Sequence, residues 1–277
     1  MKHLLKIGLI AIVIMLLPVA LKAQTPTSSP LPSVTGYVTF DNANKNDTVT
    51  VGSRMPYLVS PQTPITGLSF EYKWLFSNSQ PILSLAGAPL TAISNDYYTA
   101  NEISAVMPST PGNITIMNNV RSVLTATSTI LCTGADSTNT IVVIARPTVN
   151  WAAGGTEYLC TGSASVSIPL TALTGVSQIE VAYTITYYNT FDKSGGLTST
   201  APTKYLVLSG TSMNLPASEF GSGDGVYEIE ITGITDRISR KSLDPITSVA
   251  GELPADAYSV FLVPAPVTSP LQHVRNN

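Results

Sequence analysis

The stretch LSFEYKWLF, residues 68–76, decides the fold class because its aromatic and polar side chains alternate. The four aromatic residues occupy every second position, and Glu71 and Lys73 lie between them. Side chains two residues apart share one face of a β-strand, so this period predicts a strand with a buried aromatic face. The stretch VYEIEITGI, residues 226–234, places its two glutamates between apolar residues in the same way.

Further strand-like runs recur along the chain with turn residues between them. They cover residues 33–40, 48–51, 55–60, 113–117, 141–145, 158–160, 164–170, 178–188, 204–208 and 258–263. No segment shows the sustained 3.6-residue apolar period of an amphipathic helix. Frequent strands with short turns are typical of a β-sandwich rather than a parallel sheet with helices, so we predict an all-β protein.

The length of the chain, 277 residues, suits two such sandwiches. The stretch RPTVNWAAG, residues 146–154, contains Pro147, and a proline at this place marks the exit of a strand from its sheet. We therefore predict two β-sandwiches in tandem, at residues 34–147 and 152–271. The Pro-, Ser- and Thr-rich residues 24–33 are predicted to form an extended linker before them.

Residues 1–23 have the organisation of a cleaved secretory signal peptide. Lys2 and Lys6 precede an apolar run over residues 7–21, and Ala23 supplies the small residue at the cleavage position. The apolar run is short for a bilayer span. We expect an exported protein of the periplasm, the cell surface or the extracellular space, without a transmembrane segment in its mature chain.

The composition favours a folded protein and disfavours one class of partner. Charged residues make up 11% of the chain and hydrophobic residues 44%, which is not the composition of a disordered protein. Removal of the leader takes away three lysines and changes the formal net charge from −3 to −6. An acidic chain without a basic cluster argues against nucleic acid as a partner.

The two cysteines, Cys132 and Cys160, leave two interpretations open. In an oxidising compartment they can form a disulfide, and otherwise they are two buried thiols that pack as small hydrophobes. Each lies in a copy of the tetrapeptide LCTG, at residues 131–134 and 159–162. This spacing is too short for a whole sandwich, so one copy is expected near the end of the first domain and the other at the start of the second.

The residues needed for catalysis are scarce. The predicted mature chain contains a single histidine, His273, near its end. This excludes a Ser/His/Asp or Cys/His catalytic group inside a domain and the usual zinc ligand sets. The glycine-rich turn at residues 221–225 lacks the Lys and Ser/Thr of a nucleotide-binding loop. We predict no catalytic residues, no cofactor-binding residues and no metal ligands, and we predict that the protein is not an enzyme.

Two groups of acidic residues keep an alternative open. Glu228 and Glu230 lie about 7 Å apart on one strand face, a separation that glycosidases use, although a solvated strand face is the simpler interpretation. The turn at residues 41–47 offers Asp and Asn oxygens to a calcium ion, although an ordinary hairpin turn is simpler.

Two tyrosine pairs, Tyr97-Tyr98 and Tyr187-Tyr188, offer aromatic rings. Exposed tyrosines can stack on sugar rings or anchor a protein partner. Packing in the core with one ring at an edge is the simpler interpretation.

A series of motifs runs through the second half: LCTG at 159–162, SVSIPL at 165–170, LTG at 173–175, VAYTI at 181–185, YEIEITGITD at 227–236 and VPAPVTSPL at 263–271. With these motifs the second half resembles the PKD-like or immunoglobulin-like modules of large secreted envelope proteins from Bacteroidota. The resemblance covers about residues 146–277. It departs from the family in one place, because no Cys follows Asp236, and this puts the family's intradomain disulfide in doubt.

The resemblance implies an immunoglobulin-like or PKD-like sandwich in a secreted or cell-envelope structural or adhesion protein, linked to type IX secretion, gliding or surface assembly. It also implies O-glycosylation outside the cytoplasm at Asp47-Thr48-Val49 or Asp136-Ser137-Thr138. We predict protein–protein association, with an envelope or surface protein or with itself. A surface carbohydrate-binding module is the alternative. Because the last predicted strand, residues 258–263, stops near the chain end, we expect it to leave an open edge in the second domain.

Overall fold

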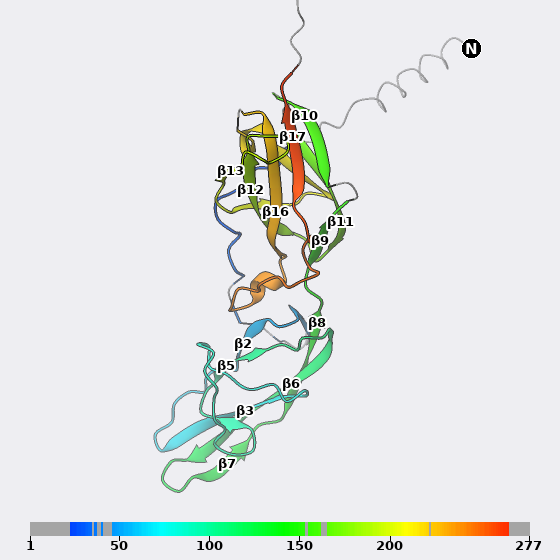
Figure 1. Cartoon of the computed structure of the whole chain (residues 1–277). Coiled ribbons are helices and arrows are strands. Elements are labelled where there is room, and N and C mark those ends of the chain that lie inside the picture. Colours follow the sequence, from blue (N-terminus) through cyan, green and yellow to red (C-terminus); the bar gives the residue numbers. More distant parts are fainter. Residues whose placement is uncertain are drawn as a thin grey trace, which may run out of the picture.

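The computed structural model describes residues 23–34, 36–37, 40, 46–152, 155–161, 165–221 and 223–265. In this part the chain forms strands, turns and two short 3₁₀ helices, η1 (Ala217–Glu219) and η2 (Ser239–Lys241). Figure 1 shows two β-sandwiches placed end to end in an elongated molecule. The predicted all-β fold of tandem immunoglobulin-like sandwiches is confirmed. The predicted signal peptide lies outside the described residues except for Ala23.

The first sandwich pairs a large sheet with a two-stranded one. The strand order of the large sheet is β1-β8-β6-β3-β4, with β7 paired to β6, while β2 and β5 form the small sheet. These strands are β1 (Asn46–Thr50), β2 (Arg54–Leu58), β3 (Leu68–Phe76), β4 (Tyr97–Tyr98), β5 (Glu102–Val106), β6 (Gly112–Leu124), β7 (Thr129–Thr133) and β8 (Ser137–Ile144). The first strand, β1, runs parallel to the last, β8.

The aromatic face of β3 forms the centre of the first core. Tyr72, Trp74 and Phe76 are all less than a tenth exposed, as the alternation of residues 68–76 predicts. The opposite face of β3 is also covered. Glu71 is buried there, and its Oε2 atom accepts a hydrogen bond from Nε of Arg121 at 2.7 Å.

The second sandwich has two larger sheets. Their orders are β10-β17-β16-β12-β13, with β14 paired to β12, and β15-β11-β9. The strands are β9 (Thr148–Trp151), β10 (Thr156–Cys160), β11 (Ser165–Thr174), β12 (Glu180–Tyr188), β13 (Leu197–Thr200), β14 (Lys204–Val207), β15 (Ser212–Pro216), β16 (Gly225–Thr235) and β17 (Tyr258–Val263). Here β10 runs parallel to the last strand, β17, so both domains repeat one arrangement.

The alternation of β16 is confirmed as well. Tyr227, Ile229 and Ile231 lie in the second core, and each is less than a tenth exposed. On the other face Glu230 is exposed, and Glu228 forms an ion pair with Lys193.

Most predicted strands are present with shifted ends, and the bounds of β3 and β17 agree with the prediction. The described residues of the predicted strand 33–40 lie in no strand. The prediction missed β4, β5, β7, β9, β13 and β15, each of which is at most five residues long. Such short strands give too few repeats of a two-residue period to be distinguished from a loop.

Residues 24–34, which we call the N-terminal strap, lie along the second sandwich (Figure 1). Thr27 exchanges two backbone hydrogen bonds with Tyr205 of β14, at 2.8 and 2.9 Å. Further along, the backbone N–H of Leu31 donates to Oε2 of Glu180 at 2.8 Å. The predicted linker therefore contacts the second domain before the chain enters the first.

Charged side chains join the two domains. Arg54 on β2 donates from Nε and Nη2 to the two carboxylate oxygens of Asp244, both at 2.6 Å. Nζ of Lys241 on η2 lies 3.0 Å from Oδ1 of Asp47 on β1. The predicted division of the chain at residues 147–152 stays a proposal.

The two cysteines lie in different domains, Cys132 on β7 and Cys160 on β10. Both are exposed, and no disulfide joins them. The interpretation of two buried thiols is wrong, because β7 lies at the side of its sheet and β10 at the edge of its own.

Candidate binding sites

The residues considered for catalysis do not assemble into a site in the described part of the chain. Glu228 is held by Lys193, whereas Glu230 is exposed. Within the described ranges, no group of three His, Cys, Asp or Glu side chains comes together around a possible metal ion. His273 lies outside the described residues. Nor does the described chain contain a helix of the length and hydropathy that a bilayer span requires.

The acidic turn proposed for calcium falls mostly outside the described residues, because only residues 46–47 of it are described. The carboxylate of Asp47 accepts a hydrogen bond from Lys241. Of the two expected glycosylation positions, Thr48 is half-buried and Ser137 is exposed. Both modifications stay predictions.

The predicted tyrosine pairs contribute little exposed surface. Tyr97 and Tyr98 are 8% and 9% exposed. Tyr187 stacks on Tyr227 with ring centroids 4.7 Å apart, and Tyr188 is half-buried. Core packing is therefore the main role of these four rings.

The most exposed aromatic ring lies elsewhere, on β10. Tyr158 is 68% exposed and stacks on Phe261 of the neighbouring strand β17, with ring centroids 4.8 Å apart and planes inclined by 25°. Phe261 in turn stacks on Phe191, at 6.4 Å and 10°. These three rings form what we call the aromatic stack, and Tyr158, on the edge strand β10, is the most exposed of them.

In the sheet order β10 is an edge strand, with β17 as its neighbour. Ser259 donates to the carbonyl of Gly155 and Thr161 donates to the carbonyl of Val263, both at 2.8 Å. In a parallel ladder every second residue bonds to the same neighbour, so the residues between these direct their N–H and C=O groups away from β17. Tyr158 is one of these residues.

The expectation that the last strand leaves an open edge is wrong. β17 pairs with β10 on one side and with β16 on the other, so both of its edges are covered. The edge strands of this sheet are β10 and β13, and β10 is the one that lies beside β17. In the sequence TEYLC, residues 156–160, the alternation places Tyr158 on the face away from the core, opposite to Glu157 and Leu159. The parallel pairing of this segment with a distant one cannot be predicted from a local period.

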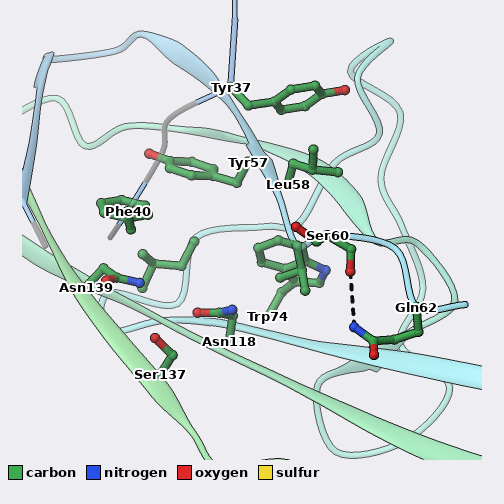
Figure 2. Close-up of a pocket in the computed structure, with 12 residues that line it drawn as sticks. Tyr37, Phe40, Tyr57, Leu58, Ser60, Gln62, Trp74, Asn118, Ser137 and Asn139 are labelled. Carbon is green, nitrogen blue, oxygen red and sulfur yellow. Dashed lines mark hydrogen bonds between the residues drawn. The ribbon is translucent and has the colours of Figure 1, made fainter. Parts of the chain in front are cut away.

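A second candidate is a cleft of about 400 Å³ in the first sandwich, shown in Figure 2. Its floor consists of residues on β3, β6 and β8, and its walls come from β2 with the following loop and from Tyr37 and Phe40. The lining residues are Tyr37, Phe40, Tyr57, Leu58, Val59, Ser60, Gln62, Trp74, Ile116, Asn118, Ser137 and Asn139. Trp74 and Ser137 belong to patterns visible in the sequence, but no local pattern predicts this cleft.

Hydrogen bonds and stacking hold the aromatic side chains of the cleft. The hydroxyl of Tyr37 donates to Oε2 of Glu102 at 2.6 Å, and this bond raises the pKa of the tyrosine. Phe40 stacks parallel to Tyr57 with centroids 6.4 Å apart. Nε1 of Trp74 donates to a backbone carbonyl at 3.0 Å, so its indole N–H is already used.

A second cavity, of about 270 Å³, lies beside the N-terminal strap. Glu180, on its wall, is only 3% exposed, and burial raises the pKa of its carboxyl group. Arg240 lies nearby, with its Nη atoms bonded to Gln178 and its Nε atom without a hydrogen-bond partner in the described chain.

Comparison with known proteins finds only distant similarity. No family model and no curated protein matches the chain. The FN1–FN3 domains of chicken CNTN1 are 12% identical with a TM-score of 0.34, over 79% of this chain and 68% of that one. The fibronectin(III)-like modules of CbhA from Clostridium thermocellum are 13% identical with a TM-score of 0.31, over 85% and 99%. The C-terminal domain of the Streptococcus agalactiae AgI/II polypeptide BspA is 10% identical with a TM-score of 0.26, over 78% and 95%. With TM-scores this low, these structures carry no inference about function.

Proposed function

We propose that this protein is a non-catalytic structural or adhesion protein of the cell envelope that acts by protein–protein association through β10. One observation carries the proposal: β10 is an edge strand, and its central residue, Tyr158, presents an exposed ring. An unpaired strand edge offers backbone donors and acceptors to another strand, and a stacked aromatic ring adds apolar area at that edge. Neither contribution needs a catalytic group.

The partner that fits this edge most simply is a second copy of the chain. Tyr158 is the central residue of β10 (Thr156–Cys160), and its backbone groups point away from β17. Two antiparallel copies related by a two-fold axis at Tyr158 would form a hydrogen-bonded pair there. Directly opposite residues lie within stacking reach, so the aromatic stack would continue from one copy into the other.

The expected dimer is weak, because one five-residue edge is a small interface. Export through a cleaved leader at residues 1–23 belongs to the same proposal. So does a link to type IX secretion, gliding or surface assembly, for which the support is the resemblance of residues 146–277 to envelope modules.

Sedimentation velocity across a range of protein concentrations tests the proposal. The wild-type chain should shift from monomer to dimer, and Tyr158→Thr should weaken the dimer about tenfold, equivalent to losing one good aromatic contact. Leu197→Thr is the matched control, since Leu197 is 60% exposed on β13, at the far edge of the same sheet. A wild-type chain that stays monomeric, or a Tyr158→Thr dimer of unchanged strength, would contradict association between copies through β10.

A further inference from the structure

The cleft of the first sandwich has a lining without charge among the described residues. Its polar side chains are amides and hydroxyls, among them Gln62, Asn118, Ser137 and Asn139. Both kinds of group donate and accept hydrogen bonds. A charged ligand would lose its hydration here without gaining an opposite charge, so the lining favours a neutral ligand that is rich in hydroxyl groups.

Asn139 gives this cleft unused hydrogen-bonding capacity. The residue is 6% exposed, and its amide makes no hydrogen bond to another described residue. In Figure 2 the amide lies on the side of the cleft where Asn118 and Ser137 also present their polar atoms. Buried amides in folded proteins are nearly always paired, so this group fits the donors and acceptors of a bound molecule.

The aromatic rings give the cleft a second property. Tyr37 is 39% exposed, and its hydroxyl bond to Glu102 fixes the ring beside the opening. Trp74 lies deeper, with its N–H already bonded, so it offers only carbon surface to the cleft. Apolar and aromatic walls with a few convergent polar groups are the usual composition of a small-molecule site.

We propose that this cleft binds a neutral saccharide, whose hydroxyl groups pair with Asn139, Asn118 and Ser137 and whose C–H faces pack on Tyr37. A saccharide meets both demands of the lining, because it carries many hydroxyl groups on an apolar ring without a charge. The cleft lies in the first domain and β10 in the second, so this site does not depend on the association through β10, and each is tested independently.

Isothermal titration calorimetry with four neutral trisaccharides tests the proposal: cellotriose, maltotriose, mannotriose and xylotriose. Trigalacturonate serves as the charged counterpart. At least one neutral trisaccharide should bind the full chain, and trigalacturonate should not. Absence of binding by all four at millimolar concentration, or binding of trigalacturonate alone, would overturn the proposal.

Substitutions then locate the site. Asn139→Leu keeps the volume but removes the amide, and should weaken binding about tenfold. Asn113→Leu makes the same change at an exposed position of β6 that does not line the cleft, and should leave binding unchanged. Tyr37→Ala removes an exposed ring without opening the core, so it covers the case in which Asn139→Leu does not fold. Unchanged affinity in a folded variant of either cleft residue would place the saccharide elsewhere.

Discussion

At the scale of the residue, Glu180 joins the N-terminal strap to the second sandwich. Its carboxylate accepts the N–H of Leu31, yet it is almost completely buried at the start of β12. Desolvation raises its pKa, and the bond from Leu31 and the charge of Arg240 offset this only in part. The folded state therefore holds the proton of this carboxyl more tightly than the unfolded chain does.

This gives a signed pH dependence. Because the pKa of Glu180 is higher in the folded state, its contribution to stability is complete below the pKa of the unfolded chain, near pH 4. The contribution is lost as the pH rises through the pKa of the folded state. Glu180→Gln keeps an acceptor for Leu31 but does not titrate. The free energy of unfolding of the wild type, relative to this variant, should therefore fall between pH 4 and pH 7 in urea titrations. Parallel curves for the two proteins would show that Glu180 does not carry the effect.

At the scale of elements, the start of β16 depends on one glycine. Gly225 has a φ of +148°, and a Cβ atom there would lie 2.2 Å from the carbonyl oxygen of Tyr188 on β12. Gly225→Ala should lower the free energy of unfolding by about 1–3 kcal/mol, because the strand pair must separate. Gly210→Ala, where a Cβ meets nothing within 4 Å, should change it by less than about 0.5 kcal/mol. Equal stability of both variants in chemical denaturation would contradict this explanation.

Strands with a long two-residue period were predicted with the most certain bounds, and the strands that were missed are all short. β3 and β16 each run through nine or more residues with an apolar face, which identifies them locally. β10 has only five residues, and its position at the sheet edge follows from a parallel pairing with β17, about a hundred residues away. The cleft likewise joins side chains from β2, β3, β6 and β8. Such sites depend on the tertiary fold, so local patterns cannot reveal them.

At the scale of the molecule, the two sandwiches are joined by more than the chain between them. The N-terminal strap runs from the second domain toward the first (Figure 1). Across the junction, Arg54 pairs with Asp244 and Lys241 pairs with Asp47. The bond from Arg54 lowers the pKa of Asp244, so the pair persists well into acid. Several polar contacts together favour one relative orientation of the domains.

The double variant Lys241→Ala/Asp244→Ala removes both ion pairs across the junction and should loosen it. Each sandwich should stay folded, because neither side chain belongs to a hydrophobic core. Small-angle X-ray scattering should show a wider distribution of molecular dimensions than for the wild type, with unchanged circular dichroism. Asp256→Ala, an exposed carboxylate outside these ion pairs, is the control. An unchanged scattering curve for the double variant would mean that these ion pairs do not set the orientation.

The central claim, association through the open edge of β10, is tested most directly by amide hydrogen exchange at Tyr158, followed by NMR at low and high protein concentration. The N–H of Tyr158 points away from β17. The N–H of the preceding residue, Glu157, points to the opposite side, toward β17. Exchange at Tyr158 should slow as the concentration rises, while Glu157 stays protected throughout. Exchange at Tyr158 that is equally fast at both concentrations would contradict pairing of this edge with a second copy.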